Sequence, residues 1–425
     1  MSVEVIPEFE SLPESWDLRP LADLVSEDRK ISYGIVQPGF HDDFGVPIIR
    51  VNNIRQNRIV ADDVMRVSAE IESQYKRTRI QGGELLVTLV GSLGEVAIAD
   101  DKYRGWNLAR AVGVVPIADP AIAEWVKFYL GSRIARYFIG MWANTTVQHT
   151  LNLKDLAQLP VPLPPAGERQ ELIELIGSLD EKIELNRKQN RTLEAIAQAL
   201  FKRWFVEFEF PDENGRPYKS SGGAMQPSEL GEIPVGWEVK PLDQIAEYLN
   251  GLALQKFPPE GDEYLPVIKI REMRQGITES SDKASTRLDQ KYIVDDGDVL
   301  FSWSGSLEVD IWCHGKGALN QHLFKVTSND YPKWFYYLWT KHHLRAFQAI
   351  AADKATTMGH IQRGHLTDAL TACPPDEELP RFSETFAPLI EKIISTRIEA
   401  RTLTKLRDTL LPKLMSGELR VGDAA

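Results

Sequence analysis

Two groups of polar loop residues have side chains that suit contacts with a DNA duplex. Arginine can bind guanine through two hydrogen bonds, and asparagine or glutamine can bind adenine in the same way. The first group follows β-branched segments in both halves of the chain: Asn52, Asn53, Arg55, Gln56, Arg58, Arg271, Arg274 and Gln275. These loops are predicted to contact bases, and solvated loop charge is the alternative interpretation.

The second group combines hydroxyl, amide and basic side chains, which commonly bind phosphate oxygens. It comprises Thr145, Thr146, Gln148, His149, Thr356, Thr357, His360 and Arg363. We predict phosphate contacts here, with helix capping by the threonines as the alternative.

Motifs for catalysis are missing. No Gly-x-x-x-x-Gly-Lys-Ser/Thr phosphate loop, no Gly-x-Gly-x-x-Gly dinucleotide loop and no Asn/Asp-Pro-Pro-Tyr/Phe methyltransferase loop occurs in the sequence. Pro211-Asp212-Glu213 starts like a nuclease carboxylate motif but lacks the Glu-x-Lys that should follow, so we interpret it as a solvated loop. The chain is therefore expected to be no enzyme by itself, with no catalytic residues.

Metal binding is also not expected. Cys313 and Cys373 lie sixty residues apart, and the adjacent pair His342-His343 lacks the i, i+4 spacing of two metal ligands on one helix.

Length and composition limit the class of protein. A chain of 425 residues is expected to form two or more domains. It is 43% hydrophobic and has no apolar run near the roughly 18 residues of a membrane span, so no membrane association is expected. An acidic N-terminus unlike a secretory signal and only two cysteines predict a cytoplasmic protein.

The net charge of −12 opposes nucleic-acid binding only if it is evenly distributed. It is not, because residues 1–28, 168–185 and 205–238 carry −7, −4 and −5. The remainder is about +4, and residues 125–155 and 333–365 are locally basic. Local basic surfaces are therefore compatible with this composition.

The chain contains an internal repeat, which must be recognised before its architecture is predicted. Residues 13–21 (PESWDLRPL) return as residues 234–242 (PVGWEVKPL), and later matches follow at offsets of 219, 214 and about 210. Among the matched positions we pair Asn107 with Asn320 and His149 with His360. Two units of roughly 200 residues are predicted, each a mixed domain followed by a helix.

Each mixed domain combines both types of secondary structure. Residues 84–90 and 299–303 are β-branched or apolar runs bounded by turn formers, which predicts strands. Residues 124–130 and 332–338 have aromatic side chains at helical spacing, which favours packed helix faces over base stacking.

The second part of each unit has the apolar periodicity of a coiled coil. The stripe in the first unit includes two asparagines, which are expected to set the register at some cost in stability. The predicted stripe residues are Leu172, Ile176, Leu179, Ile183, Asn186, Asn190, Leu193, Leu200, Phe382, Phe386, Leu389, Ile393, Leu403 and Leu410. Each stripe is roughly 48 Å long at 1.5 Å per residue. The two helices are expected to pack together, and packing of each on its own domain is the alternative.

Several motifs resemble those of one known family. They include the Trp at the start of each unit, the Gly-Glu/Asp-Leu/Val-Leu strands followed by Gly-Ser, and Leu-Pro-Pro leading to Glu168-Arg169-Gln170. The linker from Phe208 to Trp237 and the terminal residues 410–419 complete the pattern. Together these segments resemble the DNA-specificity subunit of type I restriction-modification systems. The second unit departs where Leu379-Pro380-Arg381 replaces Glu-Arg-Gln.

The resemblance implies an α+β protein with two pseudo-symmetric, mixed α/β target-recognition domains separated by a pair of long antiparallel coiled-coil helices. We place the first recognition domain at residues 1–165, its spacer helix at 166–209 and a linker at 210–232. The second recognition domain then covers residues 233–377, and the second helix and tail cover 378–425.

The resemblance also implies the function and the partners. Each domain would read one half of a split, asymmetric site in double-stranded DNA, and the helices would set the spacer and dock two methyltransferase subunits. Restriction subunits, which are ATP-dependent endonucleases and translocases, would join the complex. No cofactor is expected on this chain, since S-adenosylmethionine, ATP and magnesium would bind the partners.

Two other functions stay open at the level of sequence. One is a coiled-coil adaptor that binds proteins and has no DNA role, which predicts no sequence-dependent duplex binding. The other is a self-contained enzyme, which predicts binding of S-adenosylmethionine by the isolated chain.

Overall fold

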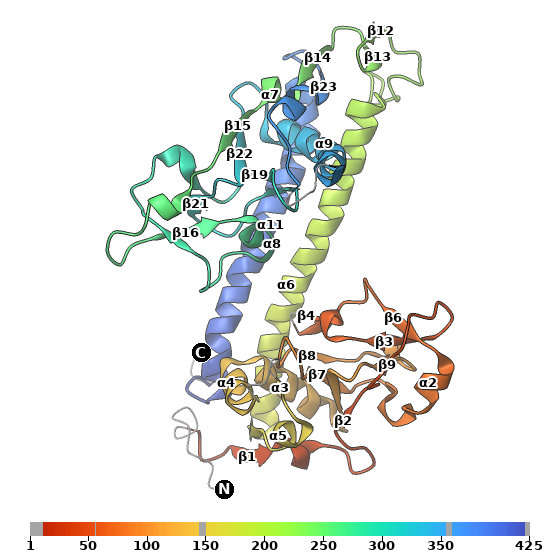
Figure 1. Ribbon diagram of the computed structural model, residues 1–425, viewed down its shortest axis with the longest axis vertical. Helices are drawn as coiled ribbons and strands as arrows, with labels where there is room; N and C mark the ends of the chain where they lie inside the picture. The colour runs from red at the N-terminus through yellow and green to blue at the C-terminus, as the bar shows by residue number, and fades with distance from the viewer. Residues whose placement is uncertain (1–11, 56, 144–149, 354–358, 421–425) are drawn as a thin grey trace. The chain divides into compact units, whose positions relative to one another are not determined.

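The computed structural model describes residues 12–55, 57–143, 150–353 and 359–420. Contacts divide the chain into two compact units: unit 1 is residues 1–181 with 403–425, and unit 2 is residues 182–402. The divisions fall within the two long helices, α6 (Ala166–Phe201) and α11 (Leu379–Met415). Each unit therefore contains one mixed α/β module together with segments of both helices (Figure 1).

The module of unit 1 is built on three small sheets and a hairpin. β1 (Asp17–Pro20) pairs with β11 (Pro160–Leu163). A four-stranded sheet has the order β2 (Ser32–Tyr33), β10 (Val112–Val115), β7 (Leu85–Thr88), β8 (Val96–Ile98). A three-stranded sheet has the order β6 (Met65–Val67), β3 (Val46–Ile49), β9 (Asn107–Leu108), and β4 (Ile54–Arg55) pairs with β5 (Arg58–Ile59). Its helices are α2 (Ala69–Ser73), α3 (Pro120–Gly131), α4 (Arg133–Trp142) and α5 (Leu153–Ala157).

The module of unit 2 repeats most of this arrangement, with a second four-stranded sheet in place of the three-stranded one. β14 (Glu238–Pro241) pairs with β23 (Leu370–Cys373), and a four-stranded sheet runs β15 (Glu247–Asn250), β22 (Leu323–Thr327), β19 (Val299–Ser302), β20 (Glu308–Ile311). The other sheet runs β17 (Lys283–Ala284), β16 (Leu265–Ile268), β21 (Gly317–Leu319), β18 (Ile293–Val294). Its helices are α7 (Leu242–Ile245), α8 (Ile270–Gln275), α9 (Lys333–Asp353) and α10 (Gly364–Thr367).

The central strands and the aromatic helices form the predicted cores. All four residues of β7 and all four of β19 are buried, as expected for apolar runs covered on both faces. In α3, Trp125 and Tyr129 are fully buried, and in α9 so is Phe335. The helices predicted from the spacing of their aromatic residues thus contribute to cores, which is the packing expected of such a stripe.

The long helices pack on each other within each unit. In unit 1, Leu172 and Ile176 of α6 share a core with Leu411 and Leu414 of α11. In unit 2, Phe201 lies 6.4 Å from Phe386, and Trp204 lies 6.0 Å from Phe382, between ring centroids. Because later residues of α6 meet earlier residues of α11, the two segments are antiparallel.

The two interpretations of the apolar stripe are both partly correct. The same side chains that join the helices also contact the modules, as when Phe205, which follows α6, packs on Trp237 and Phe382. The stripe is buried at Leu172, Ile176, Ile183, Asn186, Asn190, Phe382, Phe386 and Ile393, and half-buried at Leu179, Leu193, Leu200, Leu389, Leu403 and Leu410.

The buried asparagines of α6 are expected to lower the free energy of unfolding. The side-chain oxygen of Asn190 is buried and has no hydrogen-bond partner within the described residues. We expect Asn190→Leu to raise the free energy of unfolding by about 1 kcal/mol, because an unpaired buried amide costs roughly 1–3 kcal/mol. Urea unfolding followed by circular dichroism measures this change.

Asn186→Leu is the matched control for that variant. The side-chain oxygen of Asn186 is likewise buried without a partner among the described residues, but its Nδ2 donates to Glu399 at 3.0 Å, so its replacement loses a hydrogen bond and should gain less. A clear loss of stability in Asn190→Leu would contradict the prediction.

The linker is an ordered part of unit 2. It contains a hairpin of β12 (Met225–Ser228) and β13 (Gly231–Pro234). The ring of Phe210 stacks on Trp237 with centroids 5.3 Å apart and on Tyr218 at 4.6 Å. The turn formers of this segment therefore surround an aromatic stack, which holds the linker against the start of the second module.

Candidate nucleic-acid interface

The first predicted loop group in unit 1 surrounds the β4–β5 hairpin. Asn52 and Arg55 are exposed, and Arg55 donates from Nε to the carbonyl oxygen of Asn52 at 2.8 Å. Arg58 is half-buried, and Gln56 lies outside the described residues. The loop thus presents Asn52 and Arg55 on the surface, where a duplex can reach them.

Asn53, in contrast, supports the loop from inside. It is only 3% exposed, and its Oδ1 accepts from the backbone N–H of Arg50 at 3.0 Å. Its Nδ2 donates to the carbonyl oxygens of Val60 and Asp63. The burial of this amide gives Asn53 a structural role, and we omit it from the proposed base contacts.

The counterpart of Asn53 in unit 2 is Glu272. It is buried, and its carboxylate accepts from the backbone N–H of Lys269 at 3.2 Å, as Asn53 does from Arg50. Burial opposes ionisation of Glu272, but hydrogen bonds from Arg271 and Ser281 outweigh it and lower its pKa. Both loops therefore begin with the same side-chain cap, although the sequence shows no identical residue there.

The arginines of the unit 2 loop are engaged in ion pairs. Arg271 contacts Glu272 at 2.7 Å, and Arg274 contacts Glu308 at 2.9 Å. Gln275, at the end of α8, is exposed. A base contact by either arginine would compete with its carboxylate partner.

Most of the second predicted group lies outside the described residues, namely Thr145, Thr146, Gln148, His149, Thr356 and Thr357. His360 is exposed and forms a backbone bridge with Ser304. Arg363 donates to the carbonyl oxygen of Tyr248 at 3.1 Å and lies over the ring of Phe324. Both side chains are exposed, with His360 beside the end of β19 and Arg363 against β15 and β22.

Backbone pairing corrects the predicted alignment of the repeats. Asn107 pairs with Ile48 in unit 1. Val267, the counterpart of Ile48 in the repeat, pairs with Ala318 in unit 2, so the counterpart of Asn107 is Ala318 rather than Asn320. Thr150 bridges Val90 as His360 bridges Ser304, so position 150 is the counterpart of His360, instead of His149. Loop insertions shift the offset between repeats, and letter matching alone misplaced these pairs.

Asn107 has a structural role in its own module. It is fully buried and donates to Glu72 and to the carbonyl oxygen of Tyr75, both at 3.0 Å. Its Oδ1 accepts from the hydroxyl of Thr78 at 2.8 Å. These contacts hold α2 and the following turn against β9.

Two residues that stabilise equivalent turns were not predicted from the sequence. The hydroxyls of Thr88 and Ser302 accept from the backbone N–H groups of Glu95 and Glu308 at 2.9 and 2.8 Å. Each lies at the end of the central strand and closes the following hairpin. The shared Gly-Ser after each strand is the signal that could have located this turn.

A glutamate lies beside the initial Trp in each unit. Glu168 accepts from the indole N–H of Trp16 at 3.2 Å and from Arg420 at 2.8 Å. In unit 2, burial raises the pKa of Glu378, and the side chain of Trp237 beside it opposes this shift. The glutamate of the Glu-Arg-Gln motif is therefore retained as Glu378. The second unit differs from the motif only from Leu379 onward.

The Glu168 carboxylate should contribute stability that depends on pH. The hydrogen bond from Arg420, then that from Trp16, lowers its pKa below 4.5, so this stability is present near neutral pH. It is lost as pH falls through the folded-state pKa, since protonation removes the charge. We expect Glu168→Gln to cost about 1 kcal/mol at pH 7 and progressively less below about pH 4.5.

Urea unfolding of both proteins between pH 3 and 7 measures this difference. Glu171→Gln, an exposed neighbour on α6, is the control and should show a difference near zero. A constant stability difference across the range would contradict ionic stabilisation by Glu168.

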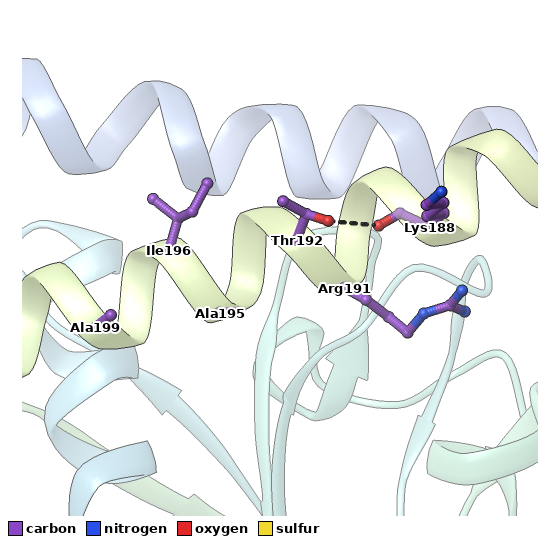
Figure 2. Close-up of a pocket in the computed structure, with 6 residues that line it drawn as sticks. All are labelled: Lys188, Arg191, Thr192, Ala195, Ile196 and Ala199. Atoms are coloured by element: carbon purple, nitrogen blue, oxygen red, sulfur yellow. Dashed lines mark hydrogen bonds between the residues drawn. The ribbon is translucent and has the colours of Figure 1, made fainter. Parts of the chain in front are cut away.

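A shallow groove of about 600 Å³ runs along α6 in unit 2 (Figure 2). Its lining combines small and aliphatic side chains with two cations: Lys188, Arg191, Thr192, Ala195, Ile196 and Ala199. Ile196 is 42% exposed, although it is a large apolar side chain on a long helix. Such a surface is suited to packing against a partner helix.

Among the described residues, no cluster of three or more His, Cys, Asp or Glu side chains is placed to hold a metal ion. Across the same described residues, no helix is both long and apolar enough to cross a membrane.

The repeated module and the paired helices define a protein with two related recognition surfaces. The family model of the type I restriction modification DNA specificity domain matches residues 13–195 and 234–402, which is most of the chain. The chain belongs to this family and is a DNA specificity subunit of a type I restriction-modification system. Subunits of this kind are the non-catalytic part of the enzyme complex.

Individual relatives agree with this assignment. The type I restriction enzyme MjaIX specificity subunit of Methanocaldococcus jannaschii is 27% identical over 80% of this chain and 78% of its own length. The HindI specificity subunit of Haemophilus influenzae is 23% identical over 88% and 94%. The crystal structure of the S subunit from M. genitalium shares the fold, with a TM-score of 0.51, 14% identity and coverage of 94% and 96%.

Proposed function

We propose that each module reads one half of a bipartite, asymmetric DNA site. The first module, residues 1–165, and the second, residues 233–377, would be the two recognition domains. The observation that carries this proposal is the repeated scaffold: the sheets β2-β10-β7-β8 and β15-β22-β19-β20 have equivalent strand orders, while the loop side chains differ. Two similar scaffolds with different surface residues suit two different base sequences.

Within this proposal the exposed loop residues contact the duplex. Asn52, Arg55 and Gln275 are candidates for base contacts, and His360 and Arg363 are candidates for phosphate contacts. Ion pairing of Arg271 and Arg274 favours a role that supports the loop. Gln56, Thr145, Thr146, Gln148, His149, Thr356 and Thr357 remain predictions from sequence.

The partners follow from the family. We propose that two methyltransferase subunits dock on the helices, residues 166–209 and 378–425, and that restriction subunits join them. The groove on α6 supports this docking, since its aliphatic residues Ala195, Ile196 and Ala199 follow the two cations Lys188 and Arg191 along the helix (Figure 2). S-adenosylmethionine, ATP and magnesium would bind the partners, and the complex would be cytoplasmic.

Methylation sequencing of DNA modified by the assembled complex tests the proposal. We expect one motif made of two defined half-sites and a spacer without sequence preference. Arg55→Ala should relax the half-site of the first domain, at about 1–3 kcal/mol for a lost bidentate contact, and leave the other unchanged. Arg19→Ala, at an exposed ion pair outside the loops, is the control. A continuous motif, or no methylation by the complex, would contradict the proposal.

A further inference from the structure

One tight turn has the same structure in both recognition domains. The backbone N–H of Val112 donates to the carbonyl oxygen of Ala109 at 2.9 Å, and that of Leu323 donates to Asn320 at 3.0 Å. Each turn connects two different sheets. In the first domain it leads from β9 of the sheet β6-β3-β9 to β10, and in the second it leads from β21 of the sheet β17-β16-β21-β18 to β22 of the sheet β15-β22-β19-β20. Its two central residues are Arg110-Ala111 in the first domain and Gln321-His322 in the second.

The backbone of this turn is held by equivalent hydrogen bonds. Arg110 donates its N–H to the carbonyl oxygen of Ile35 at 2.8 Å, and Gln321 donates to that of Leu252 at 2.9 Å. On the other side, the carbonyl oxygens of Ala111 and His322 accept from the residues that follow β7 and β19. Backbone hydrogen bonds therefore hold the two central residues of each turn on both sides.

A glycine allows this close approach in each domain. A Cβ atom on Gly34 would collide with the carbonyl oxygen of Leu108, and one on Gly251 would collide with that of Asn320. Any other residue at either position would push the turn away from its support. The two domains thus share a specific means of positioning one side chain, although that side chain differs between them.

The side chains at the first central position differ in the way that base recognition requires. Arg110 is exposed, and no hydrogen bond or ion pair is seen for its guanidinium in the described part of the chain. Gln321 is half-buried, with Nε2 3.3 Å from Nε2 of His322, whose Nδ1 lies 3.0 Å from the hydroxyl of Ser304. The guanidinium fork suits the O6 and N7 acceptors of guanine, whereas the amide suits N6 and N7 of adenine.

The surroundings of the turn diverge as well. Beside it, the first domain has Leu89 and Ala111 where the second has Trp303 and His322, whose rings lie 6.0 Å apart. The shared backbone contacts and the different side chains indicate a position that is retained for its geometry and varied for its chemistry.

We infer that this turn is a base-reading position of each recognition domain, with Arg110 reading guanine in the first half-site and Gln321 reading adenine in the second. The inference rests on the proposed division of the DNA site between the two domains. It places the specificity of both domains at one structurally equivalent position, which allows an exchange experiment.

The experiment exchanges the two side chains in the assembled methyltransferase complex. Arg110→Gln should change one position of the first half-site from guanine towards adenine, and Gln321→Arg should make the reverse change in the second half-site. The preference for the original base should fall about tenfold to a hundredfold in each case, as expected for one bidentate contact. Methylation sequencing and binding to oligonucleotides that differ only at that base measure the change.

Matched controls separate specificity from folding. Arg104→Gln and Gln290→Arg make the same exchanges at exposed positions outside the turn and should leave the motif unchanged. Thermal unfolding checks that all four variants fold. Unchanged half-sites in folded, active Arg110→Gln and Gln321→Arg complexes would overturn the inference and leave the proposed function intact, whereas a wild-type complex without a bipartite motif would refute the proposed function itself.

Discussion

Lengthening both long helices by one heptad should add about three base pairs to the recognised spacer. A heptad inserted after Asn190 and another after Ala400 extend each helix by about 10 Å and keep the apolar stripes in phase. Since B-DNA rises about 3.4 Å per base pair, both half-sites should be retained with roughly three more bases between them. The complex should no longer methylate the original site, as methylation sequencing would show.

The design of the insertion preserves the contacts of the second domain. Arg401 pairs with Asp296 at 2.7 Å and donates to the carbonyl oxygen of Cys313. The heptad inserted into α11 therefore repeats residues 401–407, so that an arginine stays beside Asp296. The two insertion points lie near each other along the antiparallel pair, because Glu194 contacts Arg397.

A five-residue insertion at the same points is the control. It rotates each stripe by about 140° and should prevent helix pairing and assembly. An unchanged spacer in a folded, active heptad variant would contradict the prediction and show that these helices do not set the spacing.

Replacing Arg397 should cause the largest loss of stability among single substitutions on the helices. Its guanidinium lies 2.6 Å from Glu194 of α6 and 2.9 Å from Asp310 of β20, so it joins both helices to the sheet. Burial opposes the charge, but Asp310 and Glu194 outweigh it and raise the pKa of Arg397 above its ordinary value. We expect Arg397→Met to cost about 2–4 kcal/mol, because two partly buried carboxylates lose their counter-charge.

Chemical denaturation of the purified chain measures this loss. The control is Arg191→Met, since Arg191 is an exposed residue that pairs with Glu184 at 3.5 Å and should contribute less than about 1 kcal/mol. Adding Glu194→Gln and Asp310→Asn to Arg397→Met should recover part of the stability. Equal small effects of Arg397→Met and Arg191→Met would contradict a buried ionic anchor.

Local pattern was sufficient to predict the elements and their duplication. The apolar runs at residues 84–90 and 299–303 form the central strands β7 and β19, and the periodic stripe forms α6 and α11. These features depend on neighbouring residues along the chain, whose spacing sets which side chains share a face. Together with the recurring motifs, they were enough to recognise the family.

Only the tertiary structure decided which polar side chains are available for DNA. Asn52 and Asn53 are adjacent and chemically identical, yet Asn52 is exposed whereas Asn53 is buried as a cap. Likewise, Arg110 and Gln321 became equivalent only through backbone hydrogen bonds to Ile35 and Leu252. Such contacts join segments far apart in sequence, and loop insertions change the offset between repeats, so periodicity carries no information about them. The sequence by itself determined the repeated elements and the family, and long-range backbone pairing determined which residues form the candidate reading surface.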